Sequence, residues 1–146
     1  RQWYGWAPDD TAYGTPDEYR PQPMPDWLRW LAARLHADGI FAGVPERALV
    51  NDYHPGQGIG AHKDRDTERI KSVAIISLGS PIMMDFTRLG QAPRAQYLYP
   101  RSLLTMHGEA REKWMHGITG RKTDKVGGLI LPRQRRLSVT FRYVSP

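Results

Sequence analysis

Residues 51–70, NDYHPGQGIGAHKDRDTERI, concentrate side chains that can bind a metal or a proton. The spacing His62-x-Asp64 places an imidazole and a carboxylate two positions apart, and residues i and i+2 of an extended strand point to the same side. A third ligand must come from another segment, and His116 in WMHGI supplies one. Two histidines and one carboxylate form the facial triad of non-haem Fe(II) oxygenases, which leaves metal positions open for a cosubstrate and O2.

The same spacing occurs elsewhere, so the spacing alone gives His62 only a modest preference. Three other histidines have a carboxylate two positions away: His36 with Asp38, His54 with Asp52, and His107 with Glu109. The first pair falls on a predicted helix, where residues two apart do not share a face, whereas the other two pairs satisfy the geometry. A structural zinc site is disfavoured because such sites usually use thiolates and the chain has no cysteine. A hydrogen-bonded turn is the competing interpretation of residues 62–64.

A second polar pattern lies in RLSVTFR, residues 136–142. A strand period of two places four polar side chains on one face, namely Arg136, Ser138, Thr140 and Arg142. If this face points into a barrel, it is costly unless it meets an anion, and a dicarboxylate suits the planar guanidinium fork. Asn51 and Tyr53 also share a face, just before His62-x-Asp64, and can donate to such a carboxylate. Each pattern also fits an amphipathic strand with its polar side in water.

One helix followed by short strands must position these side chains. DWLRWLAARLHADG predicts a helix with Asp26 as N-cap and Gly39 as its end. Strands are predicted at 48–53, 72–78, 82–86, 95–99, 102–106 and 136–144. SLGSPI, residues 77–82, predicts a tight connection between two paired strands. This order predicts a mainly β protein, an antiparallel barrel or jelly roll with a helix packed outside.

Length, composition and charge restrict the class of protein. A chain of 146 residues without cysteine fits a single domain, residues 1–146, that needs no disulfides and is compatible with a reducing compartment. No apolar run approaches the ~20 residues of a membrane span. We therefore expect no membrane partner and an intracellular monomer, cytoplasmic or nuclear, with no targeting segment visible. Residues 101–146 carry 10 Lys or Arg but 3 Asp or Glu, which fits a nucleic-acid partner or a solvated basic face.

Four segments together carry a family resemblance. NDYHPGQGIGAHKDRD, SLGSPIMMDF, GEAREKWMHGI and RLSVTFR, in this order and at these intervals, resemble the AlkB family of Fe(II)/2-oxoglutarate-dependent dioxygenases. The similarity covers about residues 50–144 and extends weakly to RQWYGW at the start. It implies a double-stranded β-helix (jelly roll) dioxygenase domain in which His62, Asp64 and His116 hold iron. The N-terminal region, where the family builds its substrate lid, is expected to be incomplete.

The resemblance also assigns residues to the cosubstrate and the substrate. The residues expected to bind 2-oxoglutarate are Asn51, Tyr53, Arg136, Ser138 and Arg142. Arg136 is expected to pair with the distal carboxylate. Asp66 occupies a base-contacting position of the DNA-repair member, and Tyr4 and Trp6 correspond to aromatics of its nucleotide lid. Met106 stands where that member has tryptophan, so the wall near the iron is expected to differ.

The implied reaction is oxidative demethylation of alkylated bases in DNA or RNA, with Fe(II), 2-oxoglutarate and O2. Hydroxylation of an N-methyl group gives a hemiaminal that collapses to formaldehyde, and succinate and CO2 are released. GQGIGAH, SLGSPIMMDF and GEAREKWMHGI are also similar to the tRNA wobble-uridine hydroxylase branch of the family. The RNA-binding and methyltransferase domains that usually accompany that branch are not visible in the sequence. From another class, a non-catalytic nucleic-acid-binding module is an alternative, which the intact triad argues against.

Overall fold

The computed structural model describes residues 1–5, 21–64 and 69–144. The strands and helices of these residues follow in chain order: β1 (Gln2–Gly5), α1 (Asp26–Ala37), β2 (Arg47–Tyr53), β3 (Ile59–His62), β4 (Ser72–Gly79), β5 (Ile82–Thr87), β6 (Arg94–Leu98), β7 (Ser102–His107), α2 (Glu109–Glu112), β8 (Met115–Ile118), β9 (Thr123–Val126), β10 (Leu129–Pro132) and β11 (Arg136–Arg142). The predicted strands occur within two residues of their expected ends.

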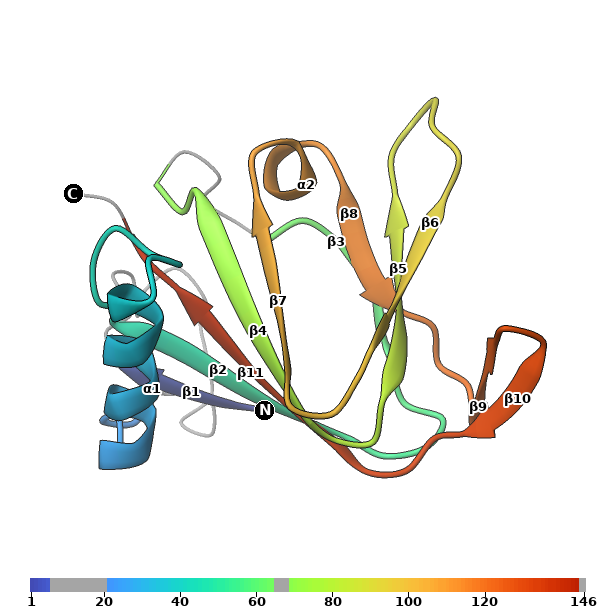
Figure 1. Ribbon diagram of the computed structural model, residues 1–146, viewed down its shortest axis with the longest axis horizontal. Coiled ribbons are helices and arrows are strands. Elements are labelled where there is room, and N and C mark those ends of the chain that lie inside the picture. Colours follow the sequence, from blue (N-terminus) through green and yellow to red (C-terminus); the bar gives the residue numbers. More distant parts are fainter. Residues whose placement is uncertain (6–20, 65–68, 145–146) are drawn as a thin grey trace.

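The strands form two antiparallel sheets that face each other (Figure 1). The larger sheet has the order β1-β2-β11-β4-β7, and the smaller has the order β3-β8-β5-β6. A separate hairpin of β9 and β10 extends from the smaller sheet's side of the molecule (Figure 1). The predicted fold class is confirmed: the domain is mainly β, a double-stranded β-helix with a helix packed outside.

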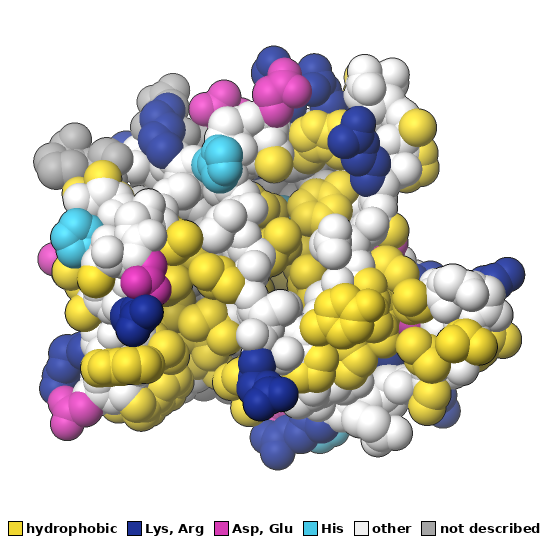
Figure 2. Space-filling model, in the orientation of Figure 1, with side chains coloured by type: hydrophobic (Ala, Val, Ile, Leu, Met, Phe, Trp, Pro, Cys, Tyr) yellow, Lys and Arg dark blue, Asp and Glu magenta, His cyan; other side chains and the backbone are white. Residues whose placement is uncertain are grey.

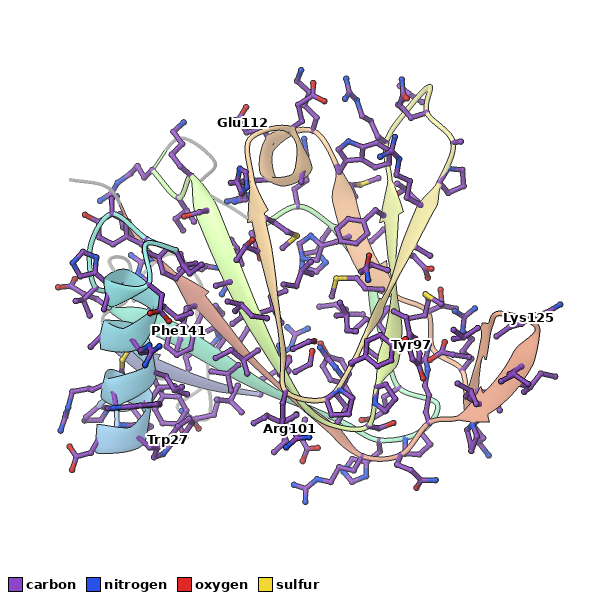
Figure 3. The ribbon with its side chains drawn as sticks, in the orientation of Figure 1. Trp27, Tyr97, Arg101, Glu112, Lys125 and Phe141 are labelled. Atoms are coloured by element: carbon purple, nitrogen blue, oxygen red, sulfur yellow. The ribbon has the colours of Figure 1, made fainter. Side chains whose placement is uncertain are left out.

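The larger sheet is buried on both faces, which explains the apolar composition of its central strands. α1 packs through Leu28, Ala32 and Leu35 against Val139 and Phe141 of β11. Figure 3 shows Phe141 beside α1 on the outer side of the sheet. The opposite face of the sheet lines the interior. A strand covered on both faces gains from apolar residues at consecutive positions, and SVAIISL of β4 has this composition.

A second apolar cluster fills the space between the two sheets. It contains side chains from β4 to β8 and the segment before β4: Ile70, Val73, Ile75, Ile82, Met84, Leu98, Met106 and Ile118. Met106, where the resemblance predicts a different wall, is thus part of the buried interior. Arg136 and Ser138 of β11 and His116 of β8 are buried between the same two sheets.

The predicted pairing of the strands joined by SLGSPI is wrong. β4 pairs with β11 and β7, whereas β5 pairs with β6 and β8, so the segment crosses from one sheet to the other. Gly79 makes this crossing possible because its φ is +79° and a Cβ there would lie 2.6 Å from the carbonyl oxygen of Arg135. Glycine alone adopts such a conformation without steric cost.

The predicted helix is confirmed, but its first residue has a different role. α1 begins at Asp26 itself, and Pro25 occupies the N-cap position. The carboxylate of Asp26 pairs with Arg29 instead of capping the helix. The helix ends at Ala37, and Gly39 with φ +77° follows the end as predicted.

The outer face of α1 is exposed and partly aromatic. Trp27 and Trp30 have exposed fractions of 50% and 64%, and Figure 2 shows apolar side chains gathered at the lower left, over α1. Within the described residues, no helix has the length and apolar character needed to cross a membrane. α1 is therefore a surface helix that buries only one of its faces.

Candidate active site

β3 and β8 bring the two predicted histidine ligands together. His62 and His116 are direct cross-strand partners, and their ring centroids lie 4.5 Å apart. Asp64 follows the end of β3, and one ligand atom from each of the three residues lies within 4.8 Å of the others. Gly117 permits this approach, because a Cβ there would lie 2.9 Å from the backbone nitrogen of Ala61. The three predicted ligands form one cluster.

The hydrogen bond of His62 and the burial of His116 both suit the binding of a cation. His62 Nδ1 lies 2.9 Å from the carbonyl oxygen of Gly60. A carbonyl only accepts, so Nδ1 carries the proton and Nε2 is left as the ligand atom. Burial lowers the pKa of His116 to about 4, although Asp64 acts in the opposite direction. The His116 ring is therefore neutral near pH 7, as a metal ligand must be.

Asp64 presents one open carboxylate oxygen. Its side chain is 7% exposed, and Oδ1 accepts a 2.6 Å hydrogen bond from Nη2 of Arg142. Oδ2 is buried and has no hydrogen-bond partner. Burial acts to raise the pKa of Asp64, but attraction to Arg142 and the hydrogen bond from it leave the pKa below its ordinary value. An ionised carboxylate with an open buried oxygen, beside two imidazoles, fits Fe(II).

α2 contacts the segment that carries Asp64. Arg111 is buried, and its Nη1 donates to the carbonyl oxygen of Asp64 at 2.9 Å. Lys63 Nζ donates in return to the carbonyl oxygen of Glu112 at 3.3 Å. Arg111 was not predicted from the sequence, because a contact across 47 positions has no periodic signature. The available signal was its place in GEAREKWMHGI, five residues before His116.

The polar face of β11 points into the interior, as the family resemblance implies and against an amphipathic strand with its polar side in water. Arg136 is paired across the strands with Tyr53, and Ser138 with Asn51. The Arg136 side chain is 1% exposed; Nη2 donates to Ser77 Oγ at 2.9 Å, while Nε and Nη1 have no partner. Burial lowers the pKa of Arg136 to about 10, so it is still a cation near pH 7. A buried guanidinium with open donors fits a carboxylate ligand.

The remaining predicted cosubstrate residues surround the same space. Asn51 and Ser138 are buried, and Oδ1 of Asn51 has no hydrogen-bond partner. Arg142 contacts Asp64 through Nη2, whereas its Nη1 is buried without a partner. It therefore links the candidate metal cluster to the arginine face of β11. The roles of these residues toward 2-oxoglutarate stay predictions.

The N-terminal strand places an unexpected aromatic beside the site. Tyr4 is paired with Ala48 and packs against the apolar cluster under α1. Trp3 is on the alternate face, and the guanidinium of Arg142 lies 5.4 Å from its ring centroid. The structure thus places Trp3, rather than Tyr4, beside Arg142, the hydrogen-bond partner of Asp64. Trp6 and Asp66 lie outside the described residues.

The alternative histidine–carboxylate pairs form other contacts. Asp52 pairs with Arg135 at 2.8 Å and lies 3.8 Å from an exposed His54. Glu109 pairs with Lys113, and Asp38 pairs with Arg34 on the helix surface. In the part of the chain that the structure describes, the group of three potential ligands is His62, Asp64 and His116.

Comparison with known proteins gives a family match across the chain. Residues 1–142 match the model of the 2OG-Fe(II) oxygenase superfamily. The chain is 36% identical to protein L905 of Acanthamoeba polyphaga mimivirus, over 85% of this chain and 60% of that protein. It is 36% identical to mouse ALKBH8, over 89% of this chain and 22% of that protein. Identity to Escherichia coli AlkB is 27%, over 97% of this chain and 64% of that protein.

A solved structure supports the fold. The structure of OsALKBH1 is 21% identical and superposes with a TM-score of 0.62, covering 87% of this chain and 69% of that one. The chain spans from less than a quarter to about three fifths of the length of mouse ALKBH8 and the mimivirus protein. The similarity therefore covers only part of each of these relatives.

Proposed function

The chain belongs to the 2OG-Fe(II) oxygenase superfamily and, within it, to the AlkB family, and on this premise we propose that it oxidatively demethylates alkylated bases in DNA or RNA. One observation carries the proposal: the buried interior holds an open carboxylate oxygen on Asp64 and open guanidinium donors on Arg136. The first requires a cation and the second an anion. Fe(II) and 2-oxoglutarate together satisfy both requirements.

Each residue then has a separate task. Bound Fe(II), with 2-oxoglutarate and O2, supplies the oxidant that hydroxylates a substrate C–H bond. His62, Asp64 and His116 would hold the metal on one side and leave its other positions open. Arg136 would anchor a carboxylate of the cosubstrate. Arg142 keeps Asp64 ionised and oriented through its 2.6 Å hydrogen bond.

The nucleic-acid substrate is supported by charge and by the relatives. Arg121 and Lys122 follow β8, the strand that carries His116, and both side chains are exposed. Lys125 extends from the β9–β10 hairpin into solvent (Figure 3). Exposed cations favour contact with a phosphate backbone. A base within a duplex must leave the stack, or be offered single-stranded, to reach a buried metal.

A second candidate is hydroxylation of a modified wobble uridine in tRNA. The mouse relative, whose name describes it as a tRNA (carboxymethyluridine(34)-5-O)-methyltransferase, is 36% identical, whereas E. coli AlkB is 27% identical. Only 22% of that mouse protein aligns, so its tRNA activity is a hypothesis for this chain. Both candidates require the same metal and cosubstrate residues, and they differ in the carbon that is oxidised.

Product analysis tests the proposal and separates the candidates. The purified chain is incubated with Fe(II), 2-oxoglutarate, O2 and panels of methylated DNA, methylated RNA and tRNA with modified wobble uridines. Demethylation releases formaldehyde and the unmodified base, whereas hydroxylation of a wobble uridine adds one oxygen and releases no formaldehyde. An Asp64→Ala protein is the control. Succinate formation with no change in any nucleic acid would contradict the nucleic-acid substrate and retain the oxygenase.

A further inference from the structure

A hollow lies on the outer face of the smaller sheet, separate from the candidate metal cluster. Its volume is about 620 Å³, within the range of small-ligand sites. Gly117 follows His116 in β8, so the two residues point to opposite faces of the sheet. Gly117 is the cross-strand partner of Asp85, and both line the hollow. The hollow and the candidate metal cluster are thus on opposite faces of the same strands.

Several of the residues that line the hollow are small. Gly117, Asp85 and Ala95 follow one another across β8, β5 and β6, and Ala61 of β3 approaches Gly117 closely. Gly60 also lines the hollow, and a Cβ there would meet nothing within 4 Å. These small residues leave room for a planar ring against the sheet.

Asp85 is the acidic residue of the lining, and among the described residues it forms no ion pair, whereas the guanidinium of Arg94, the other charged lining residue, lies 5.3 Å from the ring centroid of Trp114. The other described aspartates each pair with an arginine: Asp26 with Arg29, Asp38 with Arg34, Asp52 with Arg135, Asp64 with Arg142, and Asp124 with Arg133. Asp85 Oδ2 accepts a 2.7 Å hydrogen bond from the hydroxyl of Thr119. In a chain with 21 Lys and Arg, a half-buried carboxylate without an ion pair is available to donors of a ligand.

We propose that this hollow binds a guanine base through Asp85. A carboxylate accepts two adjacent N–H groups side by side, and guanine presents such a pair on its Watson–Crick edge, N1–H and the N2 amino group. Adenine, cytosine and uracil each present one donor group on that edge. Arg121 and Lys122 directly follow Gly120 of the lining and can contact the phosphate of the same nucleotide.

The guanine has two sources that share this chemistry. It is either a nucleotide of the strand being oxidised, in which case the inference rests on the proposed function, or a free guanine nucleotide. Single-stranded nucleic acid is commonly read through the Watson–Crick edges of splayed bases. The hollow would then select a sequence context outside the candidate active site.

Direct binding tests the hollow without any turnover. GMP, IMP, which lacks the N2 amino group, and AMP are titrated into the full chain by calorimetry. We expect GMP to bind roughly 10-fold or more tightly than IMP or AMP, since a hydrogen bond to a charged group is lost. Asp85→Asn should remove this preference, and Asp52→Asn, an aspartate outside the hollow, should retain it. Equal binding of the three nucleotides, or an Asp85→Asn protein that retains the preference, would overturn the proposal.

A second measurement identifies the source of the guanine. Succinate formation is followed with oligonucleotides in which each guanine near the modified base is replaced by inosine. A higher KM for one inosine position, absent in Asp85→Asn, assigns the guanine to the substrate strand. GMP selectivity without any inosine effect assigns the guanine to a free nucleotide.

Substrate-independent succinate formation should be unchanged in Asp85→Asn, because Asp85 is outside the candidate metal cluster. If no oligonucleotide is oxidised, the proposed function fails while the GMP titration still decides the hollow.

Discussion

Two buried regions pair aspartate with arginine, and they differ in how completely their polar atoms are satisfied. At the base of the β9–β10 hairpin, Asp124 accepts from Arg133 through both oxygens at 2.8 Å, from Arg121 at 3.0 Å and from the backbone of Met83 at 3.2 Å. Arg133 also donates to the carbonyl oxygen of Thr119 at 2.7 Å. We call this group closed, because both carboxylate oxygens of Asp124 are hydrogen-bonded within it. A two-stranded hairpin is marginal alone, and the group joins it to the smaller sheet.

The candidate active site has the opposite character. Asp64 receives one side-chain hydrogen bond, and Arg136 donates one; three further polar atoms of these two residues are buried without partners. Open buried polar atoms reduce stability, whereas a closed network contributes to it. The comparison therefore distinguishes an arginine–aspartate group that supports the fold from one that is completed by ligands.

The largest expected effect comes from removing each aspartate in turn. Asp64→Ala should reduce succinate formation below detection, because an open triad has no spare ligand, and should leave the circular dichroism spectrum unchanged. Asp124→Ala should instead lower the free energy of unfolding by about 3–5 kcal/mol, since it leaves a buried cation unpaired, and should retain activity in the folded protein. Parent activity in Asp64→Ala, or unchanged stability in Asp124→Ala, would remove the distinction.

The arginines give the second test. Arg136→Met should raise the apparent KM for 2-oxoglutarate roughly 10- to 100-fold, because a charge-assisted bond is lost, without lowering the melting temperature. Arg136→Lys should recover part of the affinity, since an ammonium cannot match both carboxylate oxygens. Arg133→Met should show the reverse, with lower stability and an unchanged KM. An unchanged KM in Arg136→Met would contradict the assignment of this strand to the cosubstrate.

A smaller effect is expected at Arg111, which positions Asp64 through its backbone. Arg111→Lys should weaken metal binding about 10-fold, as loss of an outer partner does in metal sites. The measurement is titration with Co(II), with absorbance read on the metal and activity not required. Lys113→Ala, on the exposed side of the same region, is the matched control. Equal Co(II) affinity in both variants would show that α2 does not orient the ligand.

The pH dependence of unfolding tests the closed group of Asp124 and Arg133 alone. Burial acts to raise the pKa of Asp124, but hydrogen bonds from Arg133 and Met83 leave it below its ordinary value of 3.8. A lowered folded pKa means that the stabilisation is fully present above the unfolded pKa and is lost as pH falls through the folded one. Below pH 5 the parent protein should therefore lose stability more steeply than Asp124→Asn. Parallel urea-unfolding curves against pH would contradict this.

The smallest expected effect concerns the exposed cations. Reversing the charge of Lys122 and Lys125 should flatten the salt dependence of oligonucleotide binding, by roughly 0.7–0.9 in slope for each phosphate that the protein no longer neutralises. Lys71→Glu, an exposed cation before β4, serves as the control. A salt slope that is unchanged by the reversal would place the phosphates elsewhere on the surface.

The sequence predicts the parts of the site that have local periodicity. The alternation in β11 indicated a polar face, and the burial of Arg136 and Ser138 confirms that it points inward. The strands that carry His62 and His116 were not predicted as strands, because IGAH and MHGI are short and contain glycine and histidine. Their side-by-side placement depends on a pairing across 54 positions, which no local pattern encodes.

Other features depend on which strands pair, and the same local pattern fits either outcome. SLGSPI has the composition of a hairpin turn, and only the partners of β4 and β5 show that it joins two sheets. Likewise, the choice between Trp3 and Tyr4 is set by the register of β1 on β2. A shift of one residue would exchange them between the interior and the α1 side.

β3 is an edge strand of the smaller sheet, and its registered contacts to β8 are the pairs Ile59 with Ile118 and His62 with His116. A cation shared by the two histidines would therefore act as a clamp across the weakest pairing of that sheet. Metal binding should then be measurable at the backbone. Amide hydrogen exchange at residues 59–62 should slow when metal is added, while exchange in α1 should not change. The edge of the sheet would report occupancy of the site without any substrate.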